Sequence, residues 1–215
     1  MYFSPLRTAW HHSGFRREFA ATLAVAALVI FGLTRFLDGV EKRTGVVLPD
    51  PLLALFPAVD LTWMTFLIIY AGLIGAIALL LRHPRHFLCA LQTYCLTAAV
   101  RIVAMWLVPL DPPSGMIALK DPVVEFFGGG NTLTRDLFFS GHTSTLLIIA
   151  LALPGRRARR MFFSATAAVG LCVILQHVHY TIDVFAAIFF AYGCYRAIAA
   201  FHSTRLFPGD AGALE

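Results

Sequence analysis

The sequence is poor in charge. Asp, Glu, Lys and Arg make up 13% of its 215 residues, and hydrophobic residues make up 59%, whereas soluble domains carry roughly 25% charged residues. A soluble protein of this length could not cover so much apolar surface with so few charges. The composition therefore excludes an ordinary soluble protein and indicates a single membrane-embedded domain.

Features typical of other protein classes are also missing. The four cysteines (Cys89, Cys95, Cys172 and Cys194) all lie inside apolar runs and form no CxxC pair, which indicates small buried thiols rather than a disulfide or zinc framework. The arginines stand in short links with no interleaved aromatic residues, so a nucleic-acid partner is not expected. No internal repeat and no low-complexity segment is present.

The chain does contain six apolar runs, at about residues 19–37, 59–81, 87–108, 139–153, 161–178 and 181–201. A bilayer requires about 20 residues per helix, and the run at 139–153 is short. The first run follows a basic segment, as a secretory signal does, but it is too long and lacks a cleavage site. We expect an all-α integral membrane protein with six transmembrane helices: a cytoplasmic segment at 1–18, a membrane domain at 19–201 and a cytoplasmic tail at 202–215.

The basic residues predict the orientation of these spans. Six spans put both termini on one side of the membrane, and Lys and Arg gather on the cytoplasmic side. The side of the termini carries eleven basic residues: Arg7, Arg16, Arg17, Arg82, Arg85, Arg156, Arg157, Arg159, Arg160, Arg196 and Arg205. The opposite links carry five: Arg35, Lys42, Arg43, Lys120 and Arg135. Both termini are therefore expected in the cytoplasm. The fifteen arginines and two lysines suggest a GC-rich bacterial genome, so we expect a bacterial inner membrane, with the other links facing the periplasm.

Two short motifs stand at the outward ends of predicted spans. In the first, His179 and Asp183 are four residues apart, so on a helix they would share one face. A carboxylate that accepts a hydrogen bond from one imidazole nitrogen leaves the other with a free lone pair, as a nucleophile or base requires. The alternative is an aspartate that only stabilises a helix start beside a capping histidine. Ionisable groups inside a span are costly, however, and are functional by default.

The second motif, Ser140-Gly141-His142, precedes the short fourth run. Ser140 is a natural N-cap, Gly141 allows a ligand close to the backbone, and the amides of a helix start favour an anion. His142 would then lie beside a bound phosphate and could protonate a departing oxygen. Taken alone, this motif is equally compatible with an ordinary cap and an interfacial histidine.

Arg101 is the one charge deep inside the third run, roughly 12 Å below its outer end at 1.5 Å per residue. Its guanidinium could extend outward and hold phosphate oxygens. The alternative is an ion pair with a carboxylate such as Asp60, Asp136 or Asp183.

A metal site is the main chemical alternative, because His and carboxylate groups bind zinc. Its ligands would be His142, His177, His179 and Asp183. No HExxH motif is present, and His177 and His179 would face apart on a regular helix. We therefore expect no metal and no other cofactor, and a structural role for His177.

The sequences Phe139-Ser140-Gly141-His142-Thr143 and His179-Tyr180-Thr181-Ile182-Asp183-Val184 resemble the two catalytic motifs of the sphingomyelin synthase family, a branch of the type-2 phosphatidate phosphatase superfamily. Asp136, six residues before His142, fits the fuller pattern. Leu48-Pro49-Asp50 resembles an element that follows the first span, and the segment 94–101 loosely resembles another. The resemblance covers roughly residues 46–195.

This resemblance implies a membrane lipid phosphotransferase or phospholipase C-like enzyme. His179 would attack the phosphorus of a phospholipid, Asp183 would orient it, and His142 would protonate the leaving oxygen. The head group would pass to a lipid hydroxyl, such as that of ceramide or diacylglycerol, or to water. The substrate-binding residues are expected to be Arg101, Asp136, Glu125, Ser140, Gly141 and Tyr180.

The chain also departs from the family. Thr134-Arg135 replaces a Cys-Gly pair, and the superfamily's Lys/Arg-Pro motif is not recognisable. The head group, the acceptor and the oligomeric state, a homo-oligomer included, stay open. One alternative is a lipid phosphate phosphatase that uses the same histidines. Another is a polytopic transporter or scaffold with structural histidines, although its ionisable groups should spread through the midplane of the spans.

Overall fold

The computed structural model describes residues 9–120 and 132–205. They form the helices α2 (Ser13–Val40), α3 (Thr62–Leu80), α4 (Pro84–Leu107), α6 (Gly141–Ala152), α7 (Arg156–Leu175) and α8 (Thr181–Arg205), with a 3-10 turn at Leu53–Leu55. In these ranges the β-type pairing is confined to an isolated bridge between Val46 and Leu110. The predicted all-α fold is confirmed for this part of the chain.

Among the described residues, α2, α3, α4, α7 and α8 are long and apolar enough to cross a membrane. The helix α6 has only 12 residues, about 18 Å at 1.5 Å per residue, against a hydrocarbon core of about 30 Å. It ends early because Pro154 disfavours a helical conformation at Leu153, which adopts a ψ of 131°. Five of the six predicted spans are thus supported, and a sixth stays a prediction.

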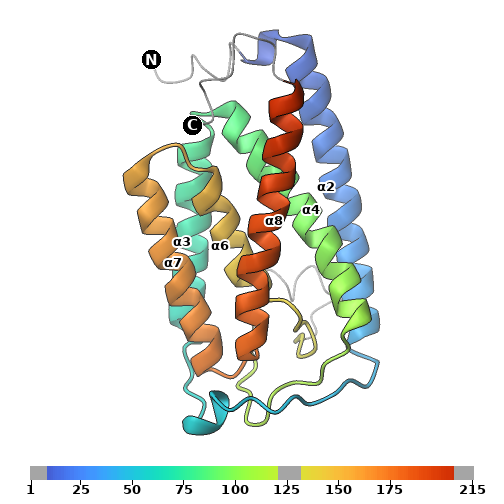
Figure 1. The fold of residues 1–215 in the computed structure, drawn as a ribbon, viewed down its shortest axis with the longest axis vertical. Coiled ribbons are helices and arrows are strands. Elements are labelled where there is room, and N and C mark those ends of the chain that lie inside the picture. Colours follow the sequence, from blue (N-terminus) through green and yellow to red (C-terminus); the bar gives the residue numbers. More distant parts are fainter. Residues whose placement is uncertain (1–8, 121–131, 206–215) are drawn as a thin grey trace.

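The helices alternate in direction, so the described chain starts and ends at the same end of the bundle, at the top of Figure 1. Hydrogen bonds hold these two ends together: the His202 ring lies 2.6 Å from Gln92 Oε1, and Gln92 Nε2 donates to Glu18 at 3.2 Å. The arginine-rich segment 156–160, predicted as a link, forms the first turns of α7 at this end. Which side of a membrane this end faces stays a prediction.

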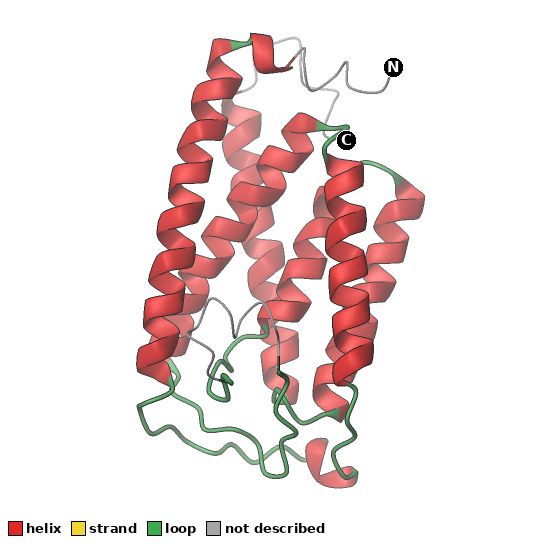
Figure 2. Ribbon diagram, turned by 180° about the vertical axis from the view of Figure 1, so that it is seen from behind, coloured by secondary structure: helices red, strands yellow, loops and turns green. Residues whose placement is uncertain are grey.

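At the other end, the links between helices bind one another (Figure 2). The Val46 amide donates to Pro109 O at 3.0 Å, and the Asp111 amide donates to Val46 O at 3.1 Å. The Glu41 carboxylate accepts from the Arg135 amide at 2.6 Å, and Arg135 Nε donates to Asp111 at 2.7 Å. The link at residues 109–138 is therefore anchored over its described parts.

This anchoring predicts a specific steric limit at Gly45. A Cβ added there would lie 2.4 Å from the Leu110 carbonyl carbon, so Gly45→Ala must push the two links apart. We expect a loss of stability of about 1–3 kcal/mol, the usual cost of overpacking, measured as a lower melting temperature in detergent. Gly39→Ala is the matched control, because a Cβ at Gly39 meets nothing within 4 Å. Equal melting of the two variants would contradict the prediction.

Candidate active site

The two motifs predicted to carry the chemistry meet at the end of the bundle where the links lie. The Ser140 amide donates to the backbone oxygen of Asp183 at 3.2 Å, which joins the start of α6 to the first turn of α8. Ser140 is fully buried, and its Oγ accepts from the Thr143 amide at 3.4 Å. The predicted N-cap at Ser140 is therefore confirmed.

His179 and Asp183 form a buried pair. His179 is 1% exposed and Asp183 is fully buried, and 3.3 Å separate His179 Nδ1 from Asp183 Oδ2. Because an ionised carboxylate can only accept, this contact requires a hydrogen on Nδ1, and a neutral imidazole then has its lone pair on Nε2. The pair therefore has the tautomer that a nucleophilic or basic histidine needs.

The predicted shared helix face of this pair is wrong, because α8 begins only at Thr181 and His179 lies in the turn before it. Contact arises because the Asp183 side chain reaches back over the helix start, where Oδ2 also accepts from the Tyr180 amide at 3.2 Å. This back-bond is the acidic half of a capping box. The same spacing of four residues thus gives contact through a cap rather than along a helix.

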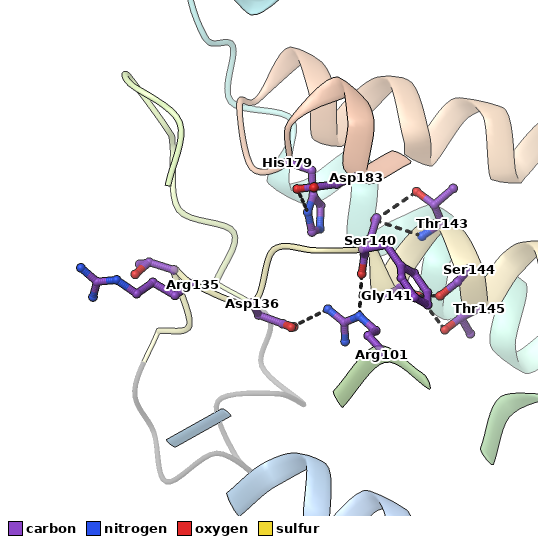
Figure 3. Close-up of polar contacts among 12 residues, drawn as sticks. Arg101, Arg135, Asp136, Ser140, Gly141, Thr143, Ser144, Thr145, His179 and Asp183 are labelled. Carbon is purple, nitrogen blue, oxygen red and sulfur yellow. Dashed lines mark hydrogen bonds and ion pairs between the residues drawn. The ribbon is translucent and has the colours of Figure 1, made fainter. Parts of the chain in front are cut away.

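The Arg101 guanidinium lies against the start of α6. Its Nε donates to Phe139 O at 2.6 Å and its Nη2 pairs with Asp136, so Asp136 is the partner among the three carboxylates left open by the sequence. A Cβ at Gly141 would lie 3.0 Å from Arg101 Nη1, so any other residue would push the guanidinium by a few tenths of an ångström. Figure 3 shows the Arg101–Asp136 and His179–Asp183 pairs on either side of the segment that enters Ser140.

The remaining predicted residues have different surroundings. His142 is the second residue of α6 and is half-buried. The Tyr180 ring is buried, and its hydroxyl donates to Asp111 O at 2.9 Å and accepts from the Leu48 amide at 3.1 Å. The hydroxyl therefore binds two of the links between helices. Glu125 lies outside the described residues.

His177 has the surroundings of a structural residue, as predicted. It is 5% exposed with a positive φ of 55°, its Nδ1 lies 3.2 Å from Ser114 O, and its ring packs against Phe56. Across residues 9–120 and 132–205, no three His, Cys, Asp or Glu side chains gather closely enough to hold a metal ion.

Two residues that organise the site were not selected from the sequence. Gln176 is fully buried and binds the start of α3: its Oε1 accepts from the Leu61 amide at 3.2 Å and its Nε2 donates to Thr62 Oγ1 at 2.8 Å. An amide side chain at the end of an apolar run was the available signal. Asp50 binds Thr181 at the start of α8, although only its resemblance to a family element had drawn attention to it.

The geometry agrees with the comparison to known families. Residues 135–200 match the family described as "PAP2 superfamily C-terminal", a range that contains Asp136, both histidine motifs and the whole of α7. No curated protein matches the chain significantly in sequence. The match covers less than half of the chain; over residues 135–200 it supports a similarity to the type-2 phosphatidate phosphatase superfamily and to phosphatase-type enzymes.

Proposed function

We propose that the chain is a sphingomyelin synthase-like phosphotransferase, or a phospholipase C-like hydrolase, of a bacterial inner membrane. The observation that carries the proposal is the 3.2 Å backbone bond between Ser140 and Asp183, because it brings a histidine–aspartate pair and a buried arginine to one helix start. A phosphodiester there would meet a nucleophile, a cation and an anion-favouring helix N-terminus together.

In the first step, His179 Nε2 attacks the phosphorus and the bond from phosphorus to the diacylglycerol oxygen breaks. Asp183 stabilises the imidazole, which gains positive charge as the new bond forms. His142 gives its proton to the departing oxygen. The products are diacylglycerol and a phosphohistidine that carries the head group.

In the second step, the hydroxyl of an acceptor attacks the same phosphorus and the bond from phosphorus to nitrogen breaks. The proton of that hydroxyl passes to His142, which restores the starting enzyme. A lipid hydroxyl gives transfer, and water gives hydrolysis. Arg101 Nη1, packed against Gly141, is proposed to hold the phosphate oxygens in both steps, while Ser140 and Asp136 hold α6 and Arg101 in position.

Labelled lipids distinguish the possible reactions. Purified protein would receive phosphatidylcholine or phosphatidylethanolamine labelled in the head group, with and without ceramide or diacylglycerol, and separately phosphatidate. Label on the acceptor supports transfer, and release of phosphorylated head group supports hydrolysis. Free phosphate from phosphatidate alone indicates a lipid phosphate phosphatase. Absence of turnover on every lipid would contradict an enzymatic role.

Substitution of the histidine–aspartate pair should abolish catalysis without unfolding the protein. His179→Ala removes the nucleophile, so turnover should fall to background; Asp183→Asn loses the tautomer control and should lower kcat at least about 100-fold. His86→Ala, at the opposite end of the bundle, is the control and should keep full activity. Wild-type rates in His179→Ala would refute the catalytic assignment.

Gly141→Ala should act through Arg101. The new Cβ would meet Arg101 Nη1 at 3.0 Å and Cζ at 3.1 Å, so the guanidinium must shift away from the helix start. A shift of a few tenths of an ångström should lower kcat/KM for a phospholipid a few-fold, since a misplacement of about 1 Å can cost about 100-fold. Gly75→Ala in α3 is the matched control, because its Cβ meets nothing within 4 Å. Unchanged kcat/KM in Gly141→Ala would argue against phosphate binding by Arg101.

A further inference from the structure

The carboxylate of Asp50 reaches from the link between α2 and α3 to the first residue of α8. Asp50 Oδ2 accepts from the Thr181 amide at 2.7 Å, and Oδ1 accepts from Thr181 Oγ1 at 3.1 Å. Oδ1 also accepts from the amides of Leu52 at 3.1 Å and Leu53 at 3.3 Å. One side chain thus ties its own link to the start of a distant helix.

The start of α8 depends on this outside cap. The first amides of a helix have no partner within the helix, and Asp183, the acidic residue of the first turn, is directed at the Tyr180 amide instead. Thr181 is therefore capped by Asp50. Burial raises the pKa of Asp50, but the hydrogen bonds from Thr181, Leu53 and Leu52 lower this pKa by more, so the cap is a charged carboxylate at neutral pH, as a helix N-terminus favours.

The link between α2 and α3 also binds the turn before α8 at a second residue, Tyr180. The Leu48 amide donates to the Tyr180 hydroxyl at 3.1 Å, so Tyr180 and Thr181 are both bound by residues 48–50. These two residues stand between His179 and Asp183 in the chain. Any rotation of the turn would change the 3.3 Å contact of that pair, which is already near the upper limit for a hydrogen bond.

We propose that Asp50 is a positioning residue for catalysis: by capping Thr181 it fixes the first turn of α8 and so orients Asp183 against His179. This inference rests on the proposed function. Without the cap, the first turn of α8 would fray, Asp183 would swing from His179, and the imidazole would lose its single tautomer. Substrate binding by Arg101, which belongs to α4, would be little changed.

Asp60 provides a matched control in the same chain. Its Oδ1 accepts from the amide of Thr62, the first residue of α3, at 3.0 Å, so it too is a carboxylate on the first amide of a helix, although it belongs to the segment that enters that helix. That helix carries no proposed catalytic group. A purely stabilising role for Asp50 would therefore make Asp50→Asn and Asp60→Asn behave alike.

The test compares Asp50→Asn and Asp60→Asn in the full-length protein in detergent. Both should melt at a lower temperature, because asparagine keeps one acceptor oxygen but loses the second acceptor and the negative charge that a helix N-terminus favours. Only Asp50→Asn should lower kcat, about tenfold or more, with KM within about twofold of wild type. Two results would overturn the proposal. In the first, kcat falls in both variants only as much as the fraction of folded protein falls. In the second, KM changes and kcat does not.

A readout without turnover separates this inference from the proposed function. NMR of protein labelled with ¹⁵N-histidine reports the tautomer of each histidine, and the His179 signals are assigned by their loss in His179→Ala. We expect the Nδ1–H tautomer in wild type and in Asp60→Asn. In Asp50→Asn we expect a mixture of the two tautomers. An unchanged tautomer in Asp50→Asn would refute the positioning role even if no lipid is turned over. A tautomer change in a protein without lipid activity would instead refute only the proposed function.

Should Asp50→Asn fail to fold, Thr181→Val tests the same link. Valine keeps the hydrogen bond from the backbone amide to Asp50 but removes the 3.1 Å hydrogen bond from the threonine hydroxyl. We expect kcat a few-fold lower at constant KM, and a small admixture of the second tautomer. Wild-type kcat and tautomer in Thr181→Val would overturn the proposal in that case.

Discussion

The pairing of the buried Arg101 guanidinium with Asp136 and Phe139 is the constraint on which the rest of this structure depends. A charged side chain within an apolar helix is costly unless it is paired and hydrogen-bonded. Asp136 and the carbonyl oxygen of Phe139 supply those partners, and both belong to the segment that leads into α6. This segment is thereby drawn onto α4, and the guanidinium lies so close to the start of α6 that a Cβ at Gly141 would come within 3.0 Å of Arg101 Nη1.

From that point the site is assembled mainly by main-chain bonds and caps. The Ser140 amide binds the Asp183 carbonyl, and Asp183 bonds back to Tyr180 and faces His179. The cap on Thr181 comes from Asp50, in a different link. The start of α8 is thus completed by a neighbouring link, so the position of the histidine depends on a link that carries no catalytic group itself.

The sequence predicted the helices well because apolar runs are a property of the chain alone. The helices α3, α4 and α8 lie close to the predicted runs, and the N-cap at Ser140 was correct. The extent of α6 and the helical arginines of α7 were less predictable, because caps and a proline decide where a helix ends. The substrate role of Tyr180 stays a prediction, and the two hydrogen bonds of its hydroxyl to other links are contacts that no local pattern reveals.

By itself the sequence determined that the chain is a helical membrane protein with two histidine motifs at one end, because hydrophobicity and residue spacing are local properties. Tertiary structure decided which groups meet. Three carboxylates were possible partners of Arg101, and packing selected Asp136. A spacing of four residues suggested one helix face for His179 and Asp183, yet the helix begins after the histidine, and a cap closes the pair. Such contacts join residues far apart in the chain or depend on the residue at which a helix starts. A local sequence pattern predicts neither of these two features.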